Sequence, residues 1–173
     1  MKRLCAILTA LLAVSACIRD RLPDGTGLEP GDRLPDFSIV MNDGSVLRTE
    51  DLAGKISVIV LFHTGCPDCR AELPDIQRIY DEYSPEVSVF CISREEEAAD
   101  VEAYWAANGL SVPYSAQKDR NVYGLFASTG VPRTYVSDPD LTVRTVYGDS
   151  PTATYMQLSA DIREISDSFH PDR

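Results

Sequence analysis

The two cysteines of the segment CPDC, Cys66 and Cys69, are the residues of this sequence whose type and spacing best suit a chemical reaction. They follow an apolar run and stand at the start of a predicted helix, where residues three apart lie one turn from each other and can form a disulfide. The unpaired N–H groups and partial positive charge of a helix N-terminus stabilise a thiolate there. We therefore predict Cys66 as the nucleophile of thiol–disulfide exchange and the more buried Cys69 as the resolving cysteine. Pro67 suits the first turn of a helix, whereas the carboxylate of Asp68 partly opposes thiolate formation.

The same residues allow two other interpretations. The pair could form a structural disulfide, or it could join His63 to supply three ligands for Cu(I) or Zn in a metal-binding or metal-delivery module. No fourth ligand is evident in the sequence, so we predict neither a resident metal nor a cofactor. His63 is more simply a strand-end residue without a catalytic task, and Cys91, inside an apolar run, is predicted to be a buried inert thiol.

The start of the sequence has the pattern of a targeting segment. Lys2 and Arg3 precede an almost wholly apolar run over residues 4–16, which is shorter than the roughly 20 residues of a membrane-spanning helix. The run ends in VSAC, which resembles the lipobox of bacterial lipoproteins and predicts lipidation of Cys17. An ordinary signal peptide with an incidental Cys17 is the alternative, while the short run disfavours an uncleaved anchor. The predicted location is the bacterial cell envelope, outside the cytoplasm and facing the periplasm, where a CxxC pair can act on disulfides of partner proteins.

The length and the charge of the chain limit the number of domains and the kind of partner. The 173 residues include 27 acidic and 16 basic ones, for a net charge of −11. No basic block is present, which excludes nucleic acid as a partner because phosphate contacts need clustered Lys and Arg. The length fits one domain. We divide the chain into a lipoprotein signal peptide (residues 1–16), a polar tether (17–29) and one folded domain (30–173).

Hydrophobic patterns predict alternating strands and helices through this domain. The run ISVIVLF at residues 56–62 is typical of a strand buried on both faces, and the apolar spacing after it predicts a helix over residues 66–83. Ser93 and Glu96 have the spacing of a capping box for a helix that ends before Gly109. Further strands are expected at residues 36–40, 87–92, 134–137 and 141–147, and further helices at 122–128 and 152–169. The sequence therefore predicts an α/β fold with a central mixed sheet, helices on both faces and an N-terminal β-hairpin.

Several motifs make the sequence similar to the thioredoxin-like superfamily, and within it to the membrane-tethered TlpA/ResA-like thiol–disulfide oxidoreductases. They are the CxxC pair, GDRLPDF at residues 31–37, DG at 43–44, DLAGK at 51–55, GVP at 130–132 and TYV at 134–136. The resemblance implies a thioredoxin-like fold and a cis peptide bond before Pro132, in a loop beside the CxxC pair. It also implies that the backbone of Val131 pairs with an extended substrate peptide. We expect Pro67 and Asp68, between the cysteines, to border the same substrate.

Glu72 matches the Glu of the pattern C-x-x-C-x-x-E-x-P in ResA-like proteins, where this carboxyl is partly buried near the cysteines. Such a carboxyl could accept or supply the proton that exchange requires, and burial would raise its pKa toward the working range. A solvated Glu in the first turns of the helix is the alternative. The sequence departs from the family in lacking the Trp residues that many members have before the pair. It also has Arg133 after Pro132, where we expect it to meet an acidic partner or to be solvated.

The resemblance implies an enzyme: a membrane-tethered thiol–disulfide oxidoreductase that exchanges a Cys66–Cys69 disulfide with envelope proteins. It suggests the reducing direction, as in cytochrome c maturation, with a membrane electron donor. The letters CPDC do not fix the direction, because redox poise depends on thiolate stabilisation across the whole site. The metal module is the alternative function. A thiol peroxidase is disfavoured, because the peroxiredoxin signature P-x-x-x-T/S-x-x-C placed on Cys66 would need Pro instead of Ile59 and Thr or Ser instead of His63.

Overall fold

The computed structural model describes residues 26–169 of the chain. The predicted signal peptide at residues 1–16, the predicted lipidation site Cys17 and most of the predicted tether fall outside the described residues, so these remain predictions. No helix within residues 26–169 is long and apolar enough to cross a membrane.

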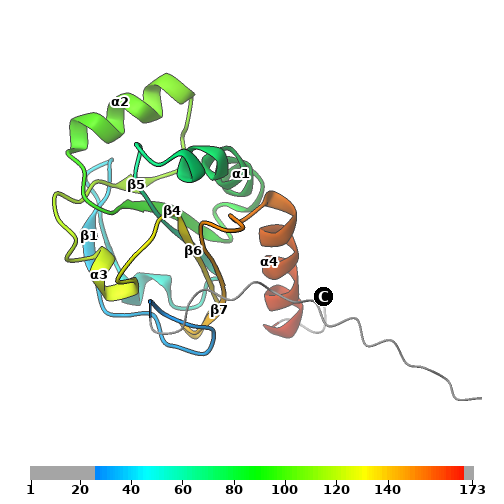
Figure 1. Ribbon diagram of the computed structural model, residues 1–173. Coiled ribbons are helices and arrows are strands. Elements are labelled where there is room, and N and C mark those ends of the chain that lie inside the picture. The colour runs from blue at the N-terminus through cyan, green and yellow to red at the C-terminus, as the bar shows by residue number, and fades with distance from the viewer. Residues whose placement is uncertain (1–25, 170–173) are drawn as a thin grey trace, which may run out of the picture.

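A five-stranded mixed sheet with the strand order β5-β4-β3-β6-β7 forms the centre of the domain (Figure 1). Its middle strand, β3 (Ser57–Phe62), has every residue buried, as the continuous apolar run predicts. Strand β4 (Ser88–Ser93) pairs parallel with β3, and β5 (Tyr114–Ser115) pairs parallel with β4. On the other side, β6 (Arg133–Ser137) is antiparallel to β3, and β7 (Val143–Tyr147) is antiparallel to β6. The carboxyl end of this fully buried middle strand leads through residues 63–65 into the CPDC segment.

The predicted N-terminal hairpin is present as a separate two-stranded sheet. Strands β1 (Ser38–Val40) and β2 (Val46–Arg48) pair antiparallel, and the turn between them contains Gly44 with a φ of +85°. Only glycine adopts this left-handed conformation without strain. A short 3-10 helix, η1 (Thr49–Leu52), connects the hairpin to the segment before β3.

Within residues 26–169, four α-helices cover both faces of the sheet, as predicted. They are α1 (Pro67–Tyr83), α2 (Ala98–Asn108), α3 (Tyr123–Phe126) and α4 (Tyr155–Phe169). Helices α1 and α4 lie together on one face, while α3 and the hairpin lie on the other (Figure 1).

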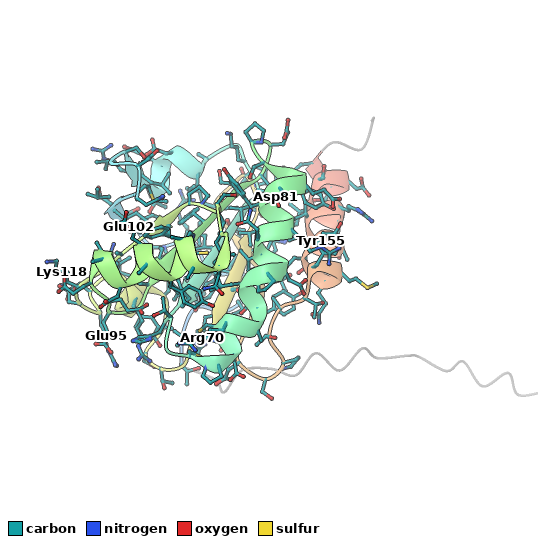
Figure 2. The ribbon with its side chains drawn as sticks, turned by 90° about the horizontal axis from the view of Figure 1, so that it is seen from above. Arg70, Asp81, Glu95, Glu102, Lys118 and Tyr155 are labelled. Carbon is teal, nitrogen blue, oxygen red and sulfur yellow. The ribbon has the colours of Figure 1, made fainter. Side chains whose placement is uncertain are left out.

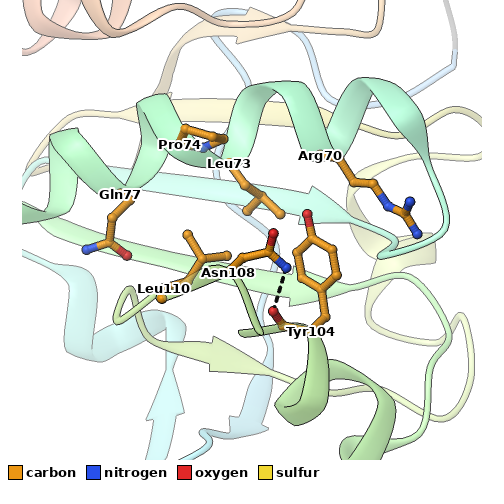
Figure 3. A pocket seen from close by; sticks show the side chains of 8 residues that line it. Arg70, Leu73, Pro74, Gln77, Tyr104, Asn108 and Leu110 are labelled. Atoms are coloured by element: carbon orange, nitrogen blue, oxygen red, sulfur yellow. Dashed lines mark hydrogen bonds between the residues drawn. The ribbon is translucent and has the colours of Figure 1, made fainter. Parts of the chain in front are cut away.

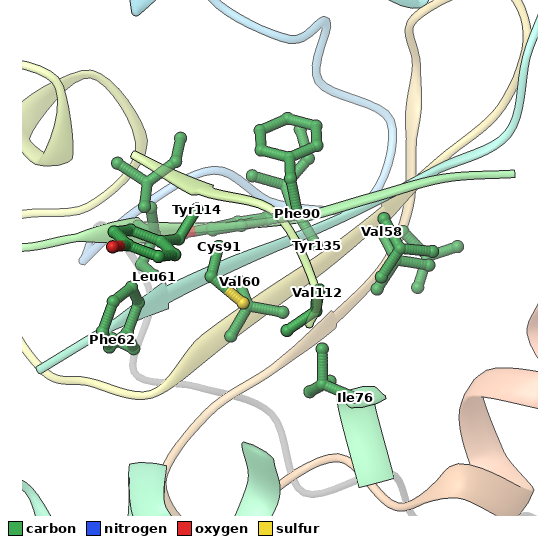
Figure 4. Close-up of a cluster of buried hydrophobic side chains, with 14 of the residues drawn as sticks. Val58, Val60, Leu61, Phe62, Ile76, Phe90, Cys91, Val112, Tyr114 and Tyr135 are labelled. Atoms are coloured by element: carbon green, nitrogen blue, oxygen red, sulfur yellow. The ribbon is translucent and has the colours of Figure 1, made fainter. Parts of the chain in front are cut away.

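Side chains that alternate along the strands fill the core on the two faces. On the α1 face, Ile76 of α1 lies below Val58 and Val60 of β3 (Figure 4). On the opposite face, the ring of Phe126 in α3 lies 5.6 Å from that of Tyr135 in β6. Phe126 also lies 5.6 Å from Phe37, which precedes β1, so the N-terminal hairpin region closes this side of the core.

Several predicted boundaries are wrong by two residues or more. Strand β1 begins at Ser38 rather than at residue 36, α3 ends at Phe126 rather than at residue 128, and α4 begins at Tyr155 rather than at residue 152. Helix α2 begins at Ala98 rather than at residue 93, because Ser93 Oγ accepts the backbone N–H of Gln117 and Glu96 binds elsewhere, so no capping box forms. Its end is as predicted, with Gly109 in the left-handed conformation. Strand β7 begins at Val143 rather than at residue 141, because Leu141 has a φ of +65° and belongs to the preceding turn.

Candidate functional site

The loop between β3 and α1 places Cys66 at the helix N-terminus. Cys66 is the N-cap residue of α1, with extended backbone angles, and Pro67 occupies the first helical position, where its missing N–H leaves nothing unsatisfied. The backbone N–H of Cys66 donates to the carbonyl of His63 at 2.9 Å, which closes a tight turn before the helix. The thiol therefore lies beside the unpaired N–H groups of the first turn, at the positive end of the helix dipole.

A second loop reaches the same place from β6. The peptide bond between Val131 and Pro132 is cis. The half-buried thiol of Cys66 donates to the carbonyl oxygen of Val131, with 3.4 Å between sulfur and oxygen. The structure thus brings together two segments that are 65 residues apart, the CPDC segment and the GVP segment.

Cys69 lies one helical turn further in and is buried, with 1% of its surface exposed. Cys66, Cys69 and Cys91 are all free thiols in the described part of the chain. Burial raises the pKa of the Cys69 thiol above its ordinary value, and the neighbouring Cys66 and Glu72 raise it further. Cys69 therefore needs an acceptor for its proton before it can act as a nucleophile.

Glu72, a further turn along α1, is a candidate for that acceptor, because it is the carboxyl that raises the pKa of the Cys69 thiol. Its side chain is 2% exposed, and its Oε1 accepts a 2.6 Å hydrogen bond from the hydroxyl of Thr134 on β6. Its Oε2 has no hydrogen-bond partner among residues 26–169. Burial raises the pKa of Glu72 to about 7, although interactions with the Thr134 hydroxyl and the Ala153 backbone oppose the rise. A carboxyl with this pKa can both take up and release a proton near neutral pH.

A shallow groove of about 420 Å³ gives access to Cys66. It is lined by His63, Gly65, Cys66, Arg94, Gly130, Val131 and Asp149. Cys66 and Val131 thus border one groove, while Pro67 and Asp68 lie exposed next to Cys66 at the start of α1.

The arrangement around His63 does not form a metal centre. Its Nδ1 accepts the backbone N–H of Gly65 at 2.9 Å, and it lies 3.6 Å from Oε1 of Glu96. Within residues 26–169, no three His, Cys, Asp or Glu side chains come together in a way that could hold a metal ion.

Arg133 differs from its prediction. It is not solvated, because only 4% of its surface is exposed, and it pairs with no carboxylate among residues 26–169. Its guanidinium donates to the carbonyl of Thr129 and to the hydroxyl of Thr26. Arg133 therefore anchors the cis-proline loop to the first described residues instead of contacting solvent. Cys91, by contrast, is buried as predicted, and burial raises the pKa of its thiol.

A second groove lies next to the site, between α1 and α2 (Figure 3). Leu73, Pro74 and Leu110 supply apolar lining, while Arg70 and Tyr104 stand at one end, with the guanidinium 5.7 Å from the ring centre. The sequence did not predict this groove, nor the contacts of Thr134 with Glu72 and of Glu96 with Thr64, because each joins residues far apart in the chain.

Comparison with known proteins agrees with this geometry. The model of the AhpC/TSA family matches residues 30–146. The thiol-disulfide oxidoreductase ResA of Oceanobacillus iheyensis is 28% identical over 142 residues, which cover 78% of this chain and 74% of ResA. Among solved structures, a secreted thiol-disulfide isomerase from Corynebacterium glutamicum has a TM-score of 0.70 at 20% identity, covering 85% of this chain and 96% of that one. The exposed lipoprotein thioredoxin Etrx1 of Streptococcus pneumoniae has a TM-score of 0.63 at 19% identity, covering 75% and 99%. The fold is thus thioredoxin-like, as the motifs predicted, and the chain belongs to the AhpC/TSA family.

Proposed function

We propose that this protein is a thiol–disulfide oxidoreductase that exchanges a Cys66–Cys69 disulfide with protein substrates. The observation that carries the proposal is the pairing of a half-buried thiol at the N-cap of α1 with a buried thiol one turn further in. The name of its ResA relative supports the same activity.

In the first step, the thiolate of Cys66 attacks one sulfur of a substrate disulfide. A bond forms between Cys66 Sγ and that sulfur, and the other substrate sulfur leaves as a thiolate. In this proposal the carbonyl of Val131, which accepts from the Cys66 thiol in the structure, also pairs with the extended backbone of the substrate. Pro67 and Asp68, exposed beside Cys66, border the substrate.

In the second step, Cys69 resolves the mixed disulfide. Its thiol gives its proton to the carboxylate of Glu72, and the resulting thiolate attacks Cys66 Sγ. A Cys66–Cys69 disulfide forms, and the second substrate sulfur leaves as a thiolate. Two electrons have then passed from the protein dithiol to the substrate, which is reduced.

We further propose that the protein works in this reducing direction in the cell envelope, in a process of the cytochrome c maturation type. A membrane electron donor would return the Cys66–Cys69 disulfide to the dithiol. The sequence VSAC supports a lipid anchor on Cys17, and one structural neighbour is an exposed lipoprotein. Replacing Cys17 by Ser should release the protein from the membrane fraction and abolish labelling by a radioactive fatty acid.

Two variants test the activity directly. Cys66→Ser should abolish reduction of a protein disulfide, whereas Cys69→Ser should form the mixed disulfide and stop there, trapping the substrate as a covalent complex visible by non-reducing electrophoresis. Cys91→Ser, which changes a buried thiol on β4, is the matched control and should leave exchange unchanged. Exchange by Cys66→Ser at the wild-type rate would refute the proposal.

The other functions considered have no comparable support. A metal module would need a third and fourth ligand beside the two cysteines, and Nδ1 of His63 is occupied by the backbone N–H of Gly65. A peroxidase would need the signature residues that Ile59 and His63 replace.

A further inference from the structure

A buried carboxylate, that of Glu96, holds the loop that carries Cys66. The Glu96 side chain is only 6% exposed. Both of its oxygens lie 3.0 Å from the backbone nitrogen of Thr64, whose N–H they share, and Oε1 also accepts the Thr64 hydroxyl. The two residues are 32 positions apart, so these hydrogen bonds connect the β4–α2 loop to the β3–α1 loop. Hydrogen bonds to a carboxylate are roughly twice as strong as those between neutral groups.

Both partners are themselves held in place. The backbone N–H of Glu96 donates to the carbonyl of Gln117 at 2.6 Å. On the far side of Thr64, Nε of Arg70 in α1 donates to the Thr64 carbonyl. Figure 2 shows Arg70 and Glu95, the neighbour of Glu96, at the same end of the molecule. The N–H, hydroxyl and carbonyl of Thr64 are therefore all engaged, from two different elements.

The position of Thr64 determines the position of Cys66. Residues 63–66 form a tight turn in which Cys66 N–H donates to the His63 carbonyl and Gly65 N–H donates to His63 Nδ1, each at 2.9 Å. A shift of Thr64 would move the whole turn and carry the sulfur away from Val131 and from the first N–H groups of α1. A displacement of about 1 Å at a reacting group can lower a rate about 100-fold.

We propose that Glu96 is a positioning residue for the nucleophile: its carboxylate acts through Thr64 to hold Cys66 Sγ at the N-terminus of α1. Glu96 does not itself line the groove that receives the substrate, although its Oε1 lies 3.6 Å from Nδ1 of His63, which does. We therefore assign it no part in the bond changes. This inference rests on the proposed function for its biological meaning, but the position of Cys66 can be tested without any protein substrate.

The test compares Glu96→Ala and Glu96→Gln with Glu97→Ala in the full, reduced chain. Glu97 is the adjacent carboxylate, is 62% exposed and pairs only with Lys118 among the described residues, so it controls for loss of charge in this loop. The readouts are the rate of Cys66 alkylation by iodoacetamide at pH 7, followed by mass spectrometry, and the rate of disulfide exchange. Glu96→Ala should slow exchange about 10- to 100-fold and also slow alkylation, because the thiolate loses its place at the helix N-terminus. Glu96→Gln should recover most of both rates, because its amide oxygen can still accept the Thr64 N–H.

Unchanged rates in Glu96→Ala would overturn the proposal. Equal losses in Glu96→Ala and Glu96→Gln would overturn it as well, because negative charge rather than hydrogen bonding would then be what matters. If Glu96→Ala fails to fold, Thr64→Val keeps the backbone contact and removes only the hydroxyl. Thr64→Val should then slow the alkylation of Cys66 relative to wild type, and alkylation at the wild-type rate would overturn the proposal. If the wild type alkylates as described but exchanges no disulfide, the proposed function fails while the positioning of Cys66 still stands.

Discussion

Replacing Glu72 by Gln tests whether a carboxyl titrates inside this fold. Burial raises the pKa of Glu72 from 4.5 to about 7, and only 2% of the side chain is exposed. The folded protein therefore holds the proton of the Glu72 carboxyl more tightly than the unfolded chain does, and protonation of Glu72 stabilises the fold. This stabilisation is complete below pH 4.5 and is lost as the pH rises through 7. One pKa unit corresponds to about 1.4 kcal/mol, so the expected loss between acidic pH and pH 8 is about 3 kcal/mol.

The measurement is urea unfolding of reduced wild type and Glu72→Gln at pH 5, 6, 7 and 8. Gln has nearly the same shape and no charge, so the variant should lack this loss and become the more stable protein at pH 8, by up to about 3 kcal/mol. Glu86→Gln, which changes an exposed carboxyl after α1, serves as the control and should follow the wild-type profile. Parallel wild-type and Glu72→Gln profiles would show that burial does not shift this carboxyl and would refute the reasoning.

The same titration should appear in the rate of exchange. If the Glu72 carboxylate accepts the proton of Cys69, the rate of resolution rises with pH through about 7 in the wild type. Glu72→Gln should lose that rise while retaining formation of the mixed disulfide. A rise of the same size in the variant would remove Glu72 from the proton transfer.

Three further predictions follow from individual contacts. Thr134→Val removes the hydroxyl that donates to Glu72, so it should destabilise the protein by about 1–2 kcal/mol in urea unfolding at pH 8 and by less at pH 5, where the carboxyl is neutral; equal losses at the two pH values would contradict this. Gly109→Ala places a Cβ at a φ of +63° and should cost about 1–2 kcal/mol in thermal unfolding, whereas an unchanged Tm would argue against a left-handed end of α2. Iodoacetamide should label Cys66 before Cys69 and Cys91 in the reduced folded protein, as followed by peptide mass spectrometry, and equal labelling would contradict the burial of the other two.

The elements that carry the cysteines could be predicted because their signals are local. An unbroken apolar run gives a strand buried on both faces, and Pro67 directly after Cys66 marks the first turn of a helix. These two features alone place Cys66 at a helix N-terminus and Cys69 one turn inside it. The burial of Glu72 was expected from resemblance, since an acidic residue near a helix start is equally well explained by solvation.

The contacts that shape the site could not be predicted, because they join distant residues. Ser93 and Glu96 have the residue types and the spacing of a capping box. Glu96 binds Thr64 instead, and α2 begins only at Ala98. Arg133 was expected to be solvated or paired with an acid, but the first described residues cover it, and carbonyl and hydroxyl groups take its hydrogen bonds. In both cases a tertiary partner outweighs a local preference.

The two carboxylates near the CPDC segment accept different numbers of hydrogen bonds, and the difference fits the separate roles that we propose for them. Both oxygens of Glu96 accept hydrogen bonds from Thr64, so this side chain is suited to hold a loop in one position. Glu72 has one oxygen bonded to Thr134 and one without a partner among the described residues, so a proton can be added to it without breaking a hydrogen bond. An unpaired buried oxygen lowers stability whenever the carboxyl is charged. A site that moves a proton at neutral pH therefore requires the same burial that destabilises the fold, and this is why a single Glu72→Gln variant should gain stability where it loses proton transfer.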